Sequence, residues 1–214
     1  MTSRTHLAEA ALTIALDIRH PFSFLALGPA IEFGREVGLR PNWLPLRGTP
    51  LRPPTRPAAS DDRSVRHRRN RARMIAREIE VYARAQGLRI EQPYREGPTR
   101  ATTYAWLWGR DRHPDRLEDL LLDLFERYWS LSLDPDDLDQ VMGRVEALHL
   151  DASDFHRFAR GEGPMLDEEV AQELLAAGFV QSPAYYIEGD LFFGRQHLSM
   201  LRWILRHRSG PRPI

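Results

Sequence analysis

Strand-forming segments occur only near the two ends of this 214-residue chain, and this separation limits the folds open to it. Residues 12–18 and 39–46 are short, apolar and β-compatible, and residues 22–37 between them carry apolar side chains at helical spacing. Pro21 suits the first turn of that helix, and Gly38 suits its C-terminal cap. A strand, a helix and a second strand within about 35 residues predict a right-handed βαβ unit.

The second group of strands lies at the C-terminal end of the chain. Residues 184–187 and 191–193 predict a tight β-hairpin whose turn is formed by Gly189 and Asp190. An amphipathic helix is expected to follow over 196–208. The chain therefore begins as βαβ and finishes as ββα.

Between these two groups the pattern is helical almost throughout. A proline-rich segment over 47–59 first predicts an exposed, extended loop. Ser60, Asp61 and Asp62 then resemble the N-terminal cap of a long helix that ends at Gln86 and is closed by Gly87. Further helices are expected over 99–109, 114–130, 135–148, 153–161 and 167–177.

This order predicts an α/β protein with a large all-helical insertion. The sheet domain is expected to comprise 10–59 and 178–210, and the insertion 60–177. Most of the aromatic side chains on the insertion helices should be core, with one or two lining an aromatic substrate pocket at the junction with the sheet. These aromatic residues are Tyr104, Trp106, Trp108, Tyr128 and Trp129.

Two residue types are missing from the composition, and each absence excludes a chemistry. The chain has no cysteine, so it cannot perform thiol–disulfide exchange or ligate zinc through its own thiolates. It has no lysine, so a Schiff-base lysine is excluded as well. The 30 basic and 30 acidic residues balance, which argues against a dedicated nucleic-acid or anionic-membrane binder. No apolar run reaches the ~18 residues of a membrane span, so we expect a cytoplasmic protein.

Two motifs resemble those of one enzyme family. DIRHPFSFLALGPA at 17–30 is similar to the D-F-x-S-P-Y-S-Y-L-A signature of 2-hydroxychromene-2-carboxylate isomerases and kappa-class glutathione transferases. QSPAYYIEGDLFFGRQHLSML at 181–201 resembles their GVPTFVVGGELFWGxDRLxxL ending. The helical stretches between the motifs are also similar, so the resemblance covers nearly the whole chain. It implies a DsbA-like thioredoxin fold, in which the sheet domain is the thioredoxin-like part.

The resemblance also implies an enzyme that forms dimers and uses glutathione. In the family, the serine of S-P-Y-S faces the glutathione sulfur, at the position where DsbA proteins carry the first cysteine of C-x-x-C. In this chain that residue is His20, and Ser23 stands at the second cysteine position. Motif matching places Pro183 at the family's cis-proline, and the preceding Ser182 is expected to offer its backbone groups to glutathione.

Other positions of the family's site carry altered residues. Pro21 and Phe22 follow His20 in the first motif and are expected at the same site. The family's lysine ahead of the long helix falls near Arg71, which can hold a carboxylate. The family's G-x-D, whose Asp binds the γ-glutamyl amine, reads Gly194-Arg195-Gln196 here. Gln196 lacks the negative charge of that aspartate.

Three residues at the start of the first helix each allow two interpretations. A helix N-terminus disfavours imidazolium, so His20 should be neutral near pH 7 and suited to general acid–base or oxyanion chemistry. The alternative for His20 is a packed remnant of a lost site. Ser23 either faces the same pocket or caps the helix turn. Asp17 either caps the end of the first strand or orients the His20 ring.

The segment 63–77 contains seven arginines and His67. At helical spacing these side chains cover more than one face, and three roles are open to them. They form a solvated helix face, an anion-binding wall for a carboxylate or phosphate, or a nucleic-acid surface. The neutral overall charge weighs against the last of these.

These observations predict an isomerase or transferase that resembles 2-hydroxychromene-2-carboxylate isomerase and acts on a small aromatic or carboxylated substrate. His20 and Ser23 are its predicted catalytic residues, and glutathione is its candidate cofactor. The alternative is a non-catalytic, degenerate thioredoxin-fold protein that binds a ligand or dimerises and has lost glutathione use. A homodimer is expected, and neither a metal nor a nucleic-acid partner is.

Overall fold

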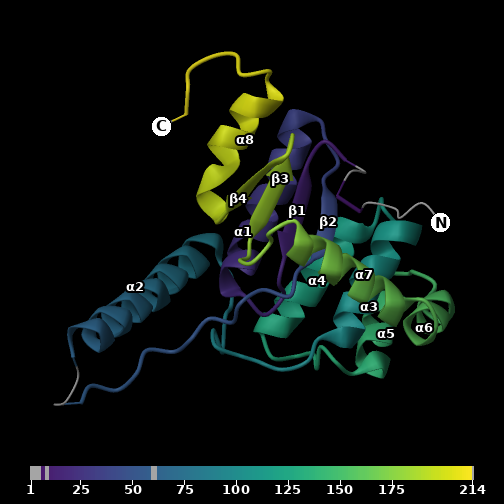
Figure 1. Ribbon diagram of the computed structural model, residues 1–214. Coiled ribbons are helices and arrows are strands. Elements are labelled where there is room, and N and C mark those ends of the chain that lie inside the picture. The colour runs from purple at the N-terminus through teal and green to yellow at the C-terminus, as the bar shows by residue number, and fades with distance from the viewer. Residues whose placement is uncertain (1–5, 8–9, 59–61, 214) are drawn as a thin grey trace.

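The computed structural model describes residues 6–7, 10–58 and 62–213 (Figure 1). In this part of the chain, four strands form one sheet in the order β2-β1-β3-β4. β1 pairs in parallel with β2, whereas β1 with β3 and β3 with β4 are antiparallel. The strands are β1 (Thr13–Leu16), β2 (Asn42–Pro45), β3 (Ala184–Ile187) and β4 (Asp190–Phe193). Both ends of the chain contribute to one sheet, as their sequence patterns predict.

α1 (Pro21–Val37) joins the two parallel strands and packs against α8 (Leu198–Leu205). The helix expected over 196–208 is divided and shorter. It begins as a 3₁₀ turn over Arg195–His197, whose hydrogen bonds are of the tighter type. It ends early because His207 and Arg208 adopt positive φ angles of 54° and 58°, which a right-handed helix cannot accommodate.

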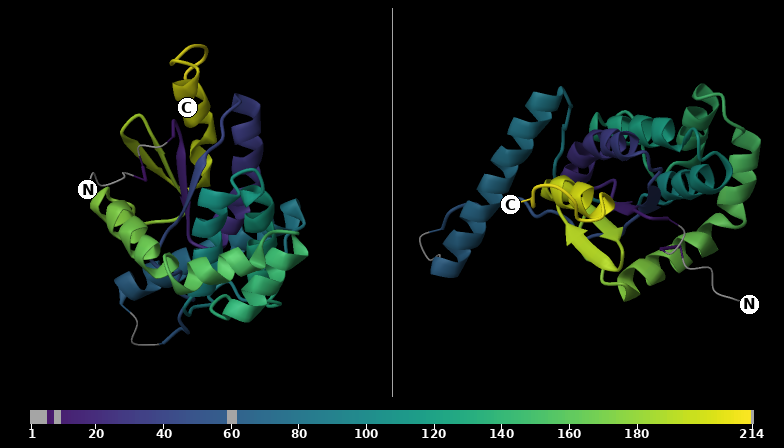
Figure 2. Two further views of the ribbon diagram at one scale, coloured as in Figure 1. Left: turned by 90° about the vertical axis from the view of Figure 1, so that its right-hand side faces the viewer. Right: turned by 90° about the horizontal axis from the view of Figure 1, so that it is seen from above.

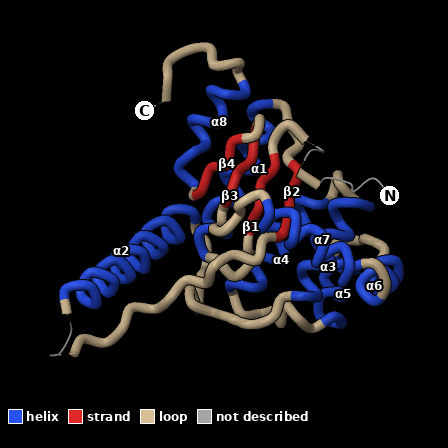
Figure 3. The backbone as a smooth tube through the Cα atoms, viewed as in Figure 1, coloured by secondary structure: helices blue, strands red, loops and turns tan. Residues whose placement is uncertain are grey.

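A second group of helices packs together at the β2 edge of the sheet (Figures 2 and 3). Within it, α3 and α7 contact β2 directly. The indole N–H of Trp106 on α3 donates to the Trp43 carbonyl on β2 at 3.1 Å, which fixes this group to the sheet. Its members are α3 (Arg100–Arg112), α4 (Leu117–Trp129), α5 (Leu138–Ala147), α6 (Ala152–Arg160) and α7 (Gly163–Ala176). α7 begins about one turn earlier than predicted, with Pro164 in its first turn.

α2 (Arg63–Gln86) projects away from the rest of the molecule and packs mainly against α1 (Figures 1 and 2). The Asp62 carboxylate caps it by accepting from the Val65 N–H at 2.9 Å, while Ser60 and Asp61 lie outside the described residues. Only Ile79 and Ala83 of this helix are buried. The described part of the proline-rich loop contains no helix or strand and is largely exposed, as expected. The division into two domains stays a prediction.

The core is continuous between the sheet and the helices. Trp106, Trp108, Tyr128 and Trp129 are buried, as predicted for the insertion helices. One expectation about the sheet is wrong: the hairpin turn lies at Glu188 and Gly189, and Asp190 already belongs to β4. Positive φ angles of 50° and 89° at these two residues give the twist that a two-residue hairpin turn requires.

Candidate functional site

A cavity of about 490 Å³ opens at the start of α1, and we name it the His20 cavity. α1, α2, the proline-rich loop and the segments flanking β3 and β4 all contribute to it. Its lining residues include His20, Phe22, Thr49, Arg52, Arg71, Glu78, Ser182, Pro183, Arg195 and Gln196. The cavity therefore brings together segments from both ends of the chain and from α2.

His20 stands at the N-cap position of α1 in an extended conformation, with its backbone N–H donating to the Asp17 carbonyl at 3.0 Å. Its ring packs 5.8 Å from the Phe22 ring. Within the described residues, the buried Nδ1 atom has no hydrogen-bond partner. Burial lowers the pKa of His20 below its ordinary 6.5, and the nearby Asp17 charge opposes this only in part. The site thus presents an imidazole that burial keeps neutral, and its Nδ1 atom is buried without a partner among the described residues.

The Ser182–Pro183 peptide bond is cis, as the resemblance implies. The Ser182 hydroxyl accepts from the Asp17 backbone N–H at 2.7 Å and lies 2.5 Å from the Ser23 hydroxyl. The Pro183 carbonyl accepts from the Gly194 N–H at 2.8 Å. These bonds fix the cis-proline segment to β1, α1 and the end of β4.

Asp17 is buried close to the site, and its carboxylate accepts several hydrogen bonds. Its carboxylate accepts from the Arg19 backbone N–H at 2.9 Å, from the Arg19 guanidinium at 2.8 and 3.0 Å, and from the Gly48 N–H at 2.9 Å. Within the described residues it makes no hydrogen bond to the His20 ring. Of the two interpretations of Asp17, the geometry supports the carboxylate that caps the turn.

The charges of the His20 cavity are predominantly positive. The Arg195 guanidinium bonds the Glu78 carboxylate at 2.7 Å and lies 3.2 Å from the centroid of the Tyr82 ring. Arg52 and Arg71 also line the cavity, and neither has an acidic partner in the described part of the chain. Two unpaired guanidinium groups favour an anionic ligand.

The sequence matches the family model of the DSBA-like thioredoxin domain over residues 33–206, which is most of the chain. The chain belongs to this family. No curated protein matched the sequence.

Two solved structures show the same fold at low identity. A 2-hydroxychromene-2-carboxylate isomerase is 14% identical over 92% of this chain and 95% of its own, with a TM-score of 0.68. A protein from Streptomyces coelicolor described as a "probable DsbA oxidoreductase" is 17% identical over 95% of this chain and 92% of its own, with a TM-score of 0.60. At such identities the likeness establishes the fold.

The DSBA-like fold brings most of the predicted site residues together. His20, Phe22, Arg71, Ser182, Pro183, Arg195 and Gln196 all line the His20 cavity. Pro21 is buried as the first residue of α1. Ser23 does not face the cavity as expected, because it is fully buried and its hydroxyl meets that of Ser182. The catalytic and binding roles of these residues stay predictions.

Sequence reasoning missed Arg52, Glu78 and Tyr82. Arg52 lies in the proline-rich loop seven residues after the end of β2, and no local pattern in the sequence marks it. Glu78 and Tyr82 share one face of α2 with Arg71 because they follow it at seven and eleven residues. A helical wheel of 63–86 anchored on Arg71 would have found both.

Among the described residues, no group of three histidine, aspartate or glutamate side chains could hold a metal ion. None of the helices they form is both long enough and apolar enough to cross a membrane.

Proposed function

We propose that this protein is an enzyme of the isomerase or transferase type that binds a small anionic ligand in the His20 cavity. One observation carries the proposal: a neutral imidazole, a cis-proline segment and two arginines without an acidic partner in the described part of the chain all line a single cavity. Arg52 and Arg71 would bind carboxylates of the ligand. His20, which lines the cavity, would accept or donate a proton through its imidazole ring.

This proposal differs from a DsbA-type oxidoreductase because the chain has no cysteine. At the position of the C-x-x-C motif it carries His20-Pro21-Phe22-Ser23. Proton transfer is the chemistry that these side chains support, and disulfide exchange through the protein's own thiols is excluded.

Glutathione fits the His20 cavity in part. Arg52 and Arg71 suit its carboxylates, and Ser182, whose backbone groups the resemblance assigns to glutathione, lines the cavity. Its amine requires an acid, and Gln196 instead directs its amide toward the Phe193 carbonyl at 3.3 Å. Glu78 is an acid that lines the cavity, although it already pairs with Arg195. When bound, glutathione would supply a thiol; His20 would hold or move a proton beside it.

The second candidate is a ligand-binding protein without turnover. Two features favour it. Gln196 stands in place of the family's aspartate, and Glu78 already neutralises the Arg195 guanidinium of the site. In this reading the cavity retains an anion and His20 has no chemical role. We further propose a cytoplasmic homodimer, on the strength of the family resemblance, to be tested by light scattering and cell fractionation.

Titration calorimetry with glutathione and S-methylglutathione tests these proposals first. We expect binding in the micromolar to low-millimolar range, weakened by Arg71→Gln. Absence of heat at several millimolar, with the protein shown to be folded, would remove glutathione from the proposal. For any ligand that is turned over, His20→Asn should preserve binding and lower kcat about 100-fold or more. Unchanged turnover in His20→Asn would contradict the catalytic role.

A further inference from the structure

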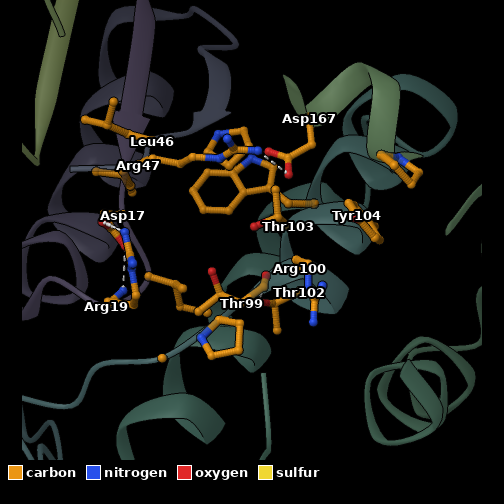
Figure 4. Close-up of a pocket in the computed structure, with 17 residues that line it drawn as sticks. Asp17, Arg19, Leu46, Arg47, Thr99, Arg100, Thr102, Thr103, Tyr104 and Asp167 are labelled. Carbon is orange, nitrogen blue, oxygen red and sulfur yellow. Dashed lines mark hydrogen bonds and ion pairs between the residues drawn. The ribbon is translucent and has the colours of Figure 1, made fainter. Parts of the chain in front are cut away.

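A second cavity, of about 360 Å³, lies between the sheet and helices α3 and α7 (Figure 4). We name it the Trp106 cavity. Residues 16–19 line it, whereas the next residue, His20, lines the other cavity. Tyr104 and Trp106 line it as well, in agreement with the expectation that one or two aromatics of the insertion helices lie at this junction.

The charged groups of the Trp106 cavity are already paired with one another or with neighbours. Arg19 bonds Asp17 at 2.8 Å on one side, and Arg47 bonds Asp167 at 2.8 Å on another (Figure 4). Arg100 bonds Asp136 at 2.7 Å. An anionic ligand would have to displace these carboxylates, and a cationic ligand would have to displace the guanidinium groups. The cavity therefore favours an uncharged ligand.

Hydroxyl groups are the polar atoms of this cavity that remain available. Thr99, Thr103 and Tyr104 line it, and within the described residues none of their hydroxyls makes a hydrogen bond. Thr102 differs, because its hydroxyl donates to the Thr99 carbonyl at 2.9 Å. The Tyr104 phenol has an ordinary pKa of 10.0, which burial raises further, and at neutral pH it is a hydrogen-bond donor. Half-buried hydroxyls of this kind can bond the polar group of a ligand.

The remaining surface of the Trp106 cavity is apolar and includes a large ring. Trp106 donates its only N–H to Trp43, so its indole has no further hydrogen bond to offer. Leu16, Ile18 and Leu46 add aliphatic surface. An aromatic or flat alicyclic ring is the shape that matches such a lining.

We propose that the Trp106 cavity is a second ligand site, which binds a neutral, flat ring bearing an amide, hydroxyl or carbonyl group. The apolar lining would hold the ring, and the hydroxyls of Thr99, Thr103 and Tyr104 would bond its polar group. The proposal goes beyond the function of the His20 cavity. It stands on different residues and holds whether or not His20 is catalytic.

Two probes of the same shape and different charge test it. 4-Fluorobenzamide is neutral and 4-fluorobenzoate is anionic, and each is titrated into the full-length protein while backbone amide signals are followed by NMR. The amide of Thr103 reports on the Trp106 cavity, and the amide of Gly194 reports on the His20 cavity. We expect the benzamide to shift the signals around Thr103 and the benzoate to shift those around Gly194.

Matched variants assign the binding. Thr103→Val keeps the side-chain shape and removes one hydroxyl, and it should weaken benzamide binding about fivefold. Thr49→Val makes the same change at the His20 cavity and should leave benzamide binding unaltered. Thr103→Leu should abolish benzamide binding by filling the Trp106 cavity, and thermal unfolding checks that the variant is folded. If Thr103→Leu does not fold, the benzamide affinity of Thr103→Val alone tests the proposal. No benzamide binding up to its solubility limit, shifts centred on Gly194, or an unchanged affinity in Thr103→Val would each overturn the proposal.

Discussion

The two cavities adjoin the same turn of the chain but differ in their charge balance. In the His20 cavity, Arg52 and Arg71 have no acidic partner among the described residues. In the Trp106 cavity, Arg19 and Arg47 each bond a carboxylate of the cavity itself. The number of arginines therefore says little about the ligand. Whether each arginine is already neutralised decides between an anionic and an uncharged ligand.

Two segments of the chain, residues 17–20 and residues 47–49, separate the cavities. Asp17 and Arg47 line the Trp106 cavity, whereas His20 and Thr49 line the His20 cavity. The Asp17–Gly48 hydrogen bond holds these segments together. We name this Asp17–Gly48 contact the partition. Substitutions at the partition should alter ligand binding in both cavities, and substitutions away from it should alter binding in only one.

The largest effect is expected from Asp17→Asn. The amide keeps the size of the side chain but leaves Arg19 without its countercharge and places an N–H₂ group among donors. Because Arg19 is only 24% exposed, the free energy of unfolding should fall by about 3 kcal/mol. Both cavities should lose affinity for their probes. Urea unfolding and the two fluorobenzene titrations measure these effects.

The matched control for Asp17→Asn is Asp115→Asn. Asp115 pairs with Arg40 at 2.5 Å, and both side chains are mostly exposed. An exposed pair contributes about 0–1 kcal/mol, so this variant should stay near the wild type. Equal losses in the two variants would show that Asp17 does not hold the partition together.

The next largest effect distinguishes the cavities. Ser182→Ala removes the hydroxyl that bonds the Asp17 N–H and the Ser23 hydroxyl, so two buried polar groups lose a partner. The free energy of unfolding should fall by about 2 kcal/mol. Benzoate binding should weaken and benzamide binding should not. Because Ser23 and Ser182 share one bond, Ser23→Ala added to Ser182→Ala should cost less than the sum of the two single changes, and full additivity would contradict the pairing.

The fold was accessible from the sequence because its signals are local. The apolar strands at both ends and the helix caps at Gly38 and Gly87 require only neighbouring residues, and α1 and α2 end where those glycines predict. The His20 cavity was accessible through the two motifs. The buried position of Ser23 was not, because it depends on the Ser182 hydroxyl, 159 residues away.

The Trp106 cavity could be anticipated only in outline. The aromatic pattern of the insertion helices indicated that one or two rings lie at the junction. The sequence could not show that Arg47 pairs with Asp167, since the two are 120 residues apart. Charge compensation is a property of tertiary contacts, and so the choice between an anionic and a neutral ligand needed the structure.

A smaller effect concerns the pH dependence of His20. Its pKa in the folded state is lower than the ordinary 6.5 because of burial, so below that pH the unfolded chain binds more protons than the folded one. The stability linked to His20 is therefore complete above 6.5 and declines as the pH falls below it. His20→Asn should reduce the slope of unfolding free energy against pH in this range. An unchanged slope, or a ring pKa above 6.5 by NMR, would contradict the burial of a neutral imidazole.

The smallest effect is expected at the contact that joins α2 to the His20 cavity. Glu78→Gln removes the charge that holds Arg195, but the pair is partly exposed and Arg195 also stacks on Tyr82. The global free energy of unfolding should change by less than about 1 kcal/mol. Hydrogen exchange should nevertheless become faster in the C-terminal turns of α2, because this contact ties that part of the helix to the end of β4. Benzoate binding should strengthen slightly, since Arg195 then becomes a third unpaired cation of the cavity. Arg77→Gln, which breaks the neighbouring Arg77–Glu80 pair at 2.9 Å on the same helix, is the control and should leave benzoate binding unaltered.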